Sequence, residues 1–299
     1  MTGSGPSSEL PPQPGGSELT YASYLRLDEL LALQDVRSDP PEHDELLFIV
    51  FHQVTELWFR QILHELDKLV VDFTGGRTFS AAHTLTRLRR ILRTVVDQLD
   101  VLETLTPLSF GQFRDRLERA SGFQSMQFRE IEFVLGRKRA EVLELYPSDL
   151  PGLDRARRRL YEPSVVDAFH RYLAIHDVDV PDEVLDRDVT APTEPNEVVQ
   201  EGILARYLAD RELRIVFELM TDVDEILQEW RYRHAKVVER TIGNKPGTAG
   251  SLGVAYLRST IFEPMFPDLW ASTLGFKAIN RLSAVNPQQD EVSWGSAQL

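Results

Sequence analysis

Hydrophobic positions recur at helical spacing along most of the chain, and this pattern predicts long helices. The longest segment without proline or glycine runs from Glu45 to about Asp72, and His52 lies within it, one turn after Phe48. Residues three and four positions apart share one face of a helix. In this segment they form a broad face that predicts a buried helix: Phe48, Phe51, Thr55, Trp58, Phe59, Ile62, Leu66 and Leu69.

The same spacing continues through most of the remaining sequence. A second long helix is predicted from Ala81 to about Leu105. After a short helix, a Ser-Gly break at 121–122 precedes another helix that ends near residue 136. From Glu197 to Gly243 the pattern is again helical, either as one very long helix or as two helices that meet near Asp210.

No stretch longer than a few residues alternates between apolar and polar positions as a strand does, and no internal repeat is present. The last helical segment, near residues 254–274, is expected to be ended by Pro264 and Pro267. The sequence therefore predicts an all-α fold built on long antiparallel helices that form a bundle.

The composition changes along the chain and predicts a division into three parts, the second of which contains an insertion. Residues 1–18 are dominated by Gly, Pro and Ser and are expected to be a disordered tail. Residues 19–285 are expected to form a single helical domain, and residues 286–299 a loose C-terminal tail. Several prolines divide the segment at about 146–196, which predicts shorter helices that form an insertion or a cap.

Charge and cysteine content exclude several classes of function. The 33 basic and 47 acidic residues give a net charge of −14, which argues against binding to nucleic acid or to an anionic membrane. Without cysteine, the chain has no disulfide, zinc-thiolate site, iron–sulfur cluster or cysteine nucleophile. The longest apolar run, 46–51, is too short to span a bilayer, and no signal-peptide pattern is present, so we expect a cytoplasmic protein.

Three standard kinds of functional site do not match the sequence. A di-iron site in a bundle needs a Glu-x-x-His pair on each of two helices, and the chain does not supply them. A G-x-S-x-G nucleophile motif and a Walker-type phosphate loop are also missing, since the glycine-rich stretch GNKPGTAGSLG follows a helix and not a strand.

Two histidines on separate apolar helices remain, His52 and His234. A lone histidine on such a face is more often a hydrogen-bonded core residue, but a neutral imidazole is also a natural axial ligand of haem iron, in an apolar slot between helices. Arg114 is either a surface charge beside Asp115 or the group that pairs with the carboxylate of a ligand.

Four stretches of the sequence resemble one known family. They are LTYASYLRLDELL, DPPEHDELLFIVFHQVTELWFRQILHEL, FRDRLERASGFQSMQFREIEFVLG and RHAKVVERTIGNKPGTAGSLGVAYL, which extend from residue 19 to about 270. Together they resemble the tryptophan 2,3-dioxygenases, which are haem enzymes. The resemblance therefore covers nearly all of the predicted helical domain.

The resemblance implies a helical bundle around a pocket for haem b, with O2 as co-substrate, and a homotetramer. His234 would be the proximal iron ligand, and His52 the distal histidine that meets the indole N–H. The expected reaction is insertion of O2 across the indole C2–C3 bond of L-tryptophan, which gives N-formylkynurenine. The remaining residues expected to contact the substrate are Phe48 and Phe51 at the indole, Arg114 and Ser121 at the carboxylate, Thr248 at the ammonium, and Tyr21, Tyr24 and Leu25 from a neighbouring subunit.

The glycine-rich loop departs from the family pattern, because Ala249 and Leu252 stand where glycine and a hydroxyl residue are usual. Alanine resists the positive φ that glycine adopts. An alternative function is therefore a related haem oxygenase of secondary metabolism that acts on a substituted tryptophan or another indole and inserts one oxygen atom. A third hypothesis is a helical interaction protein without catalysis, and it conflicts with the joint presence of four residues: His52, Arg114, Thr248 and His234.

Overall fold

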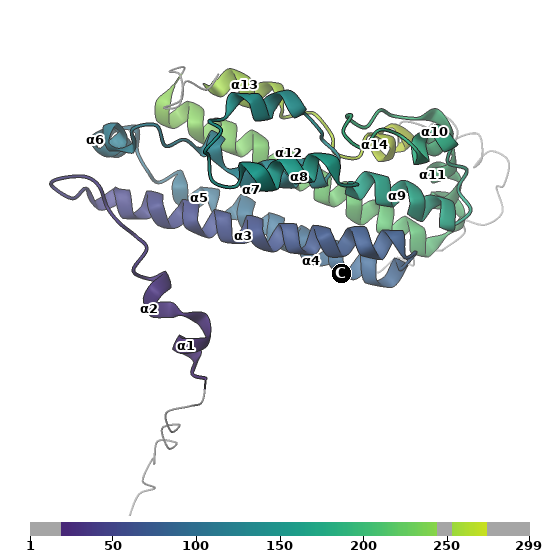
Figure 1. The fold of residues 1–299 in the computed structure, drawn as a ribbon, viewed down its shortest axis with the longest axis horizontal. Helices are drawn as coiled ribbons and strands as arrows, with labels where there is room; N and C mark the ends of the chain where they lie inside the picture. The colour runs from purple at the N-terminus through teal and green to yellow at the C-terminus, as the bar shows by residue number, and fades with distance from the viewer. Residues whose placement is uncertain (1–18, 244–252, 274–299) are drawn as a thin grey trace, which may run out of the picture.

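The computed structural model describes residues 19–243 and 253–273, and all the regular structure in these two ranges is helical (Figure 1). The predicted all-α class is therefore confirmed. The expected tails at 1–18 and 286–299 lie outside the described residues, as do Thr248, Ala249 and Leu252.

Three long helices form the frame of the molecule: α3 (His43–Thr74), α4 (Thr78–Asp97) and α12 (Arg211–Ile242). A turn at 75–77 reverses the chain, so α3 and α4 run antiparallel, and α12 packs along α4 (Figure 1). Gly76 has φ +64°, and a Cβ at that position would lie 2.9 Å from the Ile175 side chain, so the turn requires glycine. The apolar faces of the long helices meet in one continuous core, which includes Leu66, Leu69, Leu85, Leu88, Val216 and Met220.

The predicted long helices are present, with corrections at their ends. The helix expected from Ala81 to Leu105 is divided at Gln98 into α4 and the short α5 (Leu99–Leu102). Of the two alternatives for the segment that follows Glu197, two helices are correct: α11 (Glu197–Ala209) and α12. They meet at Asp210, whose carboxylate accepts hydrogen bonds from the first backbone N–H groups of α12.

The expectation for Pro267 was wrong. It does not end a helix but begins one, α14 (Pro267–Thr273), while α13 (Gly253–Ser259) ends before Pro264 is reached. Proline has no N–H to donate, and the N–H groups of the first helical turn have no partner within the helix. Proline is therefore well suited to the first position of a helix.

Shorter helices cover the frame. Figure 1 shows α6 and α13 near one end of the bundle, α7 and α8 alongside α3, and α10, α11 and α14 towards the opposite end. The bounds of the elements not yet given are α6 (Pro107–Phe113), η1 (Arg114–Leu117), η2 (Gly122–Gln124), α7 (Met126–Val134), η3 (Ala140–Leu145), α8 (Leu153–Tyr161), α9 (Val165–Ile175) and α10 (Asp182–Leu185).

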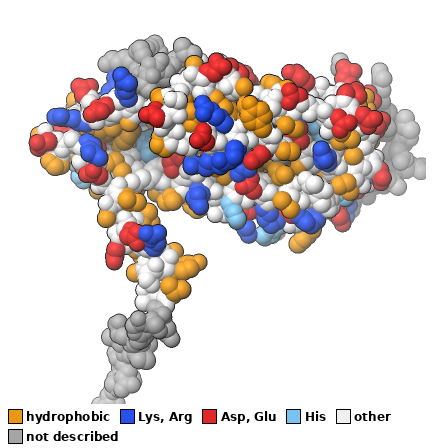
Figure 2. Space-filling model, in the orientation of Figure 1, with side chains coloured by type: hydrophobic (Ala, Val, Ile, Leu, Met, Phe, Trp, Pro, Cys, Tyr) orange, Lys and Arg blue, Asp and Glu red, His pale blue; other side chains and the backbone are white. Residues whose placement is uncertain are grey.

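An N-terminal arm projects from the body and carries α1 (Tyr21–Leu25) and α2 (Leu27–Leu30). Apolar side chains are exposed along it (Figure 2), and Tyr21 and Tyr24 keep 76% and 73% of their surface in solvent. Within the parts of the chain that the structure describes, no helix is both long and apolar enough to cross a membrane.

Candidate functional site

A cavity of about 270 Å³ lies at the end of the bundle where the N-terminal half of α3 faces the C-terminal half of α12. The segments from α5 to α7 and helix α13 complete its wall. A mostly apolar cavity between helices is the usual form of a ligand or cofactor site in a bundle. Its lining is rich in aromatic side chains, among them Phe48, Phe51, Phe59, Phe110, Phe128 and Trp230.

His52 borders this cavity from α3. Its Nδ1 lies 2.7 Å from the Phe48 carbonyl oxygen one turn earlier. A carbonyl only accepts, so Nδ1 carries the proton of this hydrogen bond. Burial lowers the pKa of His52, against the weaker opposing effects of the Phe48 carbonyl and the Glu56 carboxylate. The imidazole is therefore neutral at pH 7, and its Nε2 has a free lone pair with which to accept a hydrogen bond.

His234 borders the same cavity from α12. Its ring stacks on the Trp230 indole one turn earlier, with centroids 4.9 Å apart and planes inclined by 6°. Burial, with a smaller effect of the nearby His52, lowers the pKa of His234 to about 4. A neutral imidazole held by a flat aromatic contact is a suitable ligand for a haem iron. No trio of histidine and carboxylate side chains within 19–243 and 253–273 is arranged to hold a metal ion.

The structure brings Arg114 and Ser121 to the same cavity. Arg114 begins η1 directly after α6, and Ser121 caps η2 by accepting a hydrogen bond from the Phe123 N–H at 3.3 Å. The start of η1 is fixed by the buried Phe113, whose ring packs edge-on against Phe48 at 5.6 Å. Packing of α6 against α3 therefore places this polar pair beside the aromatic wall.

Three other predicted site residues, all on the N-terminal arm, are not at the cavity of their own chain. Tyr21, Tyr24 and Leu25 are exposed on the arm, away from the bundle, and do not line the cavity. Thr248 lies outside the described residues.

The sequence reasoning missed a group of buried charges at one side of the cavity, on and around α7. Glu132 is 2% exposed, and its carboxylate is surrounded by four guanidinium groups. Arg129 forms an ion pair with it, Arg139 and Arg231 each approach it at 3.2 Å, and Arg137 lies 4.0 Å away. Burial alone would raise the pKa of Glu132, but these cations hold that pKa below its ordinary value. We call these five residues the arginine cluster.

The cluster has more buried hydrogen-bond donors than acceptors. Arg129 Nε, Arg137 Nη1 and Arg139 Nε are buried without a hydrogen-bond partner. Arg129, Glu132 and Arg231 border the cavity directly. Buried cations with unused donors fit a ligand that brings its own carboxylates, as a haem does. The available signal in the sequence was the spacing of Arg129 and Glu132, three residues apart on one helix.

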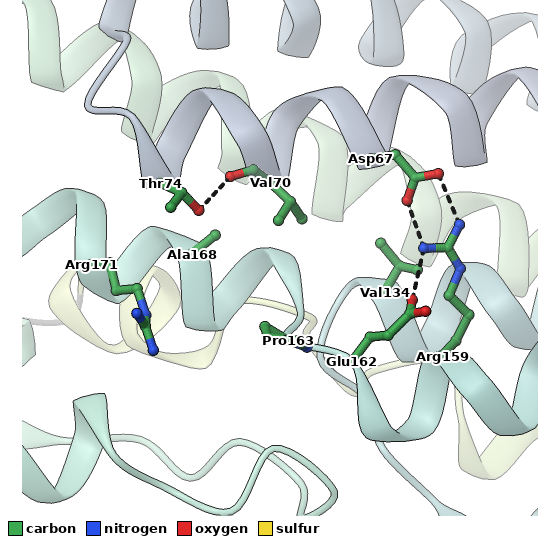
Figure 3. Close-up of a pocket in the computed structure, with 9 residues that line it drawn as sticks. All are labelled: Asp67, Val70, Thr74, Val134, Arg159, Glu162, Pro163, Ala168 and Arg171. Atoms are coloured by element: carbon green, nitrogen blue, oxygen red, sulfur yellow. Dashed lines mark hydrogen bonds and ion pairs between the residues drawn. The ribbon is translucent and has the colours of Figure 1, made fainter.

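A second hollow, of about 320 Å³, lies between α3 and the segment that joins α8 to α9 (Figure 3). Most of the charged side chains that line it form ion pairs with each other. Arg159 bridges two carboxylates, with Nη1 2.7 Å from Asp67 and 3.0 Å from Glu162. Val70, Val134 and the neighbouring aliphatic atoms form the rest of the surface, and no histidine borders it. We therefore assign the candidate chemistry to the cavity that His52 and His234 share.

An all-α chain with such a cavity belongs to the class of helical proteins that enclose a ligand inside a bundle. The sequence model of the family described as tryptophan 2,3-dioxygenase matches residues 13–148 and 208–274. The interval between these segments contains α8, α9, α10 and most of α11.

Three relatives, each named tryptophan 2,3-dioxygenase, are similar over most of their length. That of Herpetosiphon aurantiacus is 53% identical over 85% of this chain and 96% of its own. That of Anaeromyxobacter dehalogenans is 53% identical over 87% of this chain and 97% of its own. That of Kineococcus radiotolerans is 43% identical over 85% and 90%, respectively. The chain belongs to the tryptophan 2,3-dioxygenase family, and the resemblance seen in the sequence is confirmed.

Proposed function

We propose that the protein catalyses insertion of O2 across the indole C2–C3 bond of L-tryptophan, with haem b as cofactor, to give N-formylkynurenine. Membership of the family supports this reaction. The single observation that carries it is the meeting of His52 and His234, both neutral, at one apolar cavity.

The residues present fit a haem at this site. His234 would bind the iron through one imidazole nitrogen, and the stacked Trp230 would fix the orientation of that ring. Arg129 borders the cavity, and its Nε is buried without a hydrogen-bond partner, so this side chain would receive a haem carboxylate. When bound, ferrous haem supplies an open coordination position for O2 and the electrons that activate it.

The remaining residues would orient the substrate. Phe48 and Phe51 would pack against the indole, and the unprotonated Nε2 of His52 would accept a hydrogen bond from the indole N–H. We assign His52 to positioning and not to obligatory proton abstraction. Arg114 and Ser121 would bind the carboxylate, and Thr248 the ammonium group. The largely apolar wall excludes water from the reacting atoms.

We also propose that the protein is a cytoplasmic homotetramer in which Tyr21, Tyr24 and Leu25 of one subunit reach the site of another. The exposure of these side chains on a projecting arm supports that arrangement. A tyrosine left in solvent by its own chain retains a large apolar surface that contact with another subunit would bury.

The decisive test is product analysis by mass spectrometry. Purified protein loaded with haem should show a haem absorption band. Its ferrous form, given O2 and L-tryptophan, should yield a product with two added oxygen atoms. His234→Ala should lose most of the band, whereas His83→Ala, at an exposed histidine of α4, should keep it.

The same measurement separates this function from its alternative. A product with one added oxygen atom, or turnover of substituted indoles only, would establish a related oxygenase of different specificity. Wild-type protein that stays colourless when haem is available would exclude both activities.

A further inference from the structure

Glu132 connects three elements at the side of the cavity. It lies on α7 and contacts Arg231 of α12, three residues before His234. Its other partner Arg139 donates to the Tyr256 hydroxyl of α13 at 3.1 Å. A single buried carboxylate therefore links the helix of the proposed iron ligand to two further walls of the site.

The other terminal nitrogen of the Arg231 guanidinium extends this connection. Its Nη1 donates to the backbone carbonyls of Thr260 at 3.2 Å and Glu263 at 3.0 Å, at the turn that follows α13. With Nη2 on Glu132 at 3.2 Å, this guanidinium is held from both sides. Its position, and with it that of the cations around the cavity, depends on the carboxylate of Glu132.

The charge at this side of the cavity is unbalanced. Four guanidinium groups surround one carboxylate that is almost fully buried. Among the described residues, Glu263 is the other acid that forms an ion pair with this group of arginines; it pairs with Arg137 and is 56% exposed, and Asp224 acts on Arg231 electrostatically. Low polarisability around buried groups makes their charges act strongly on a neighbouring redox centre. Removal of Glu132 would take from four guanidinium groups the buried carboxylate that they share at this side of the cavity.

We propose that Glu132 is a positioning residue that fixes the arginine cluster and lowers the reduction potential of the iron. The proposal rests on the haem-dependent function given above. A buried negative charge stabilises ferric iron relative to ferrous iron, and the surrounding arginines have the opposite effect. Glu132 thereby offsets part of the cationic field that the cluster would otherwise impose on the site.

The test is a spectroelectrochemical titration of the haem-loaded protein and its Glu132→Gln, Glu132→Asp and Glu130→Gln variants. Glu132→Gln should shift the midpoint potential to a more positive value, whereas Glu132→Asp, which keeps the charge, should stay close to the wild type. Glu130 is a matched control because it is also a buried carboxylate of α7, but pairs with Arg155 and Arg159 and does not border the cavity. Glu130→Gln should leave the potential unchanged.

Arg139→Gln gives a second, independent reading, because it removes a positive charge from the same cluster. It should shift the midpoint potential to a more negative value, opposite to Glu132→Gln. This variant keeps the proposal testable if Glu132→Gln does not fold, since Arg139 is at the edge of the cluster, with its side chain 17% exposed.

Thermal unfolding of the haem-free proteins separates the effect of the Glu132 charge on the potential from a purely structural role of this residue. If Glu132→Gln and Glu132→Asp lower Tm equally while the potential stays fixed in both, Glu132 only crosslinks the helices and the tuning role is wrong. Equal shifts in Glu130→Gln and Glu132→Gln would also overturn it. Failure of the wild-type protein to bind haem would refute the proposed function instead, and is seen before any variant is compared.

Discussion

At the scale of single residues, burial decides the state of both histidines. Within the described residues, neither His52 nor His234 has a carboxylate hydrogen-bonded to its ring, and desolvation is the largest influence on the pKa of each, so both remain neutral. A neutral ring has one donor and one acceptor nitrogen, and the Phe48 carbonyl determines which is which in His52. The sequence places both residues on apolar faces but does not show this orientation.

The depressed pKa of His234 predicts a loss of stability in mild acid for haem-free protein. The unfolded chain binds a proton at this residue below pH of about 6.5, whereas the folded protein resists it until the pKa of about 4. The unfolded state therefore holds more protons in this window, and the free energy of unfolding should fall as pH decreases from about 6.5 towards 4. Denaturant titrations at several pH values measure this pH dependence of the free energy of unfolding.

Two variants control this pH experiment. His234→Gln should flatten the slope in part, with the remainder due to His52, whose pKa burial also lowers. His83→Gln, at an exposed position, should leave the slope intact. Equal slopes in wild-type and His234→Gln proteins would show that His234 is already accessible to protons in the folded state.

Arg114 should contribute strongly to binding of the amino-acid end of the substrate. Loss of one partner of a buried charge pair typically costs about 2–5 kcal/mol, so Arg114→Ala should lower kcat/KM by at least about 30-fold. Arg114→Lys should recover only part of the loss, because lysine lacks the planar fork that binds a carboxylate at two points. Arg119→Ala, at a nearby exposed position, is the control, and wild-type kinetics in Arg114→Ala would refute the clamp.

At the scale of elements, helix ends are set by local hydrogen bonds that a hydrophobic pattern does not contain. The pattern predicted α3 from Glu45 to Asp72, close to the observed His43–Thr74, because its core-facing positions repeat without interruption. It left open whether α11 and α12 were one helix. Asp210 decides this, since its carboxylate accepts from Glu212 N at 2.9 Å and Leu213 N at 3.0 Å and so begins a new helix.

Removal of this cap should destabilise the protein measurably. Asp210→Ala should lower the free energy of unfolding by roughly 0.5–2 kcal/mol, the usual cost of losing an N-cap. Asp210→Ser, which can still accept the hydrogen bond, should lose much less. Chemical denaturation of both variants measures the difference, and equal stability in both would mean that the cap contributes nothing.

At the scale of the whole molecule, the N-terminal arm projects from the bundle and leaves apolar side chains exposed (Figure 1). Its base is tied to α3, where the Gln53 amide donates to the Leu33 carbonyl at 3.0 Å and accepts from Gln34 at 2.7 Å. Beyond that point the arm leaves the body (Figure 1), and the tyrosines of α1 are exposed to solvent. Another subunit is the surface that we propose for them.

Mixed oligomers test this proposal directly. A chain with Tyr21→Ala and Tyr24→Ala should be inactive because its arms are defective, and a His234→Ala chain because it lacks the iron ligand. Co-expression should restore part of the activity, since an intact arm of the second chain can complete the intact pocket of the first. Mixed assemblies that form but remain inactive would show that each arm serves its own chain.

The sequence by itself determined the helical class and the approximate limits of the long helices, because periodicity records which face of each helix is buried. With the family resemblance it also gave His52, Arg114, Ser121 and His234 as a candidate site. Only the tertiary structure revealed the arginine cluster around Glu132. Charged residues on a short helix are usually solvated. Those of α7 are buried because α3 and α8 pack against this helix and Arg231 of α12 reaches Glu132, which depends on segments distant in the sequence.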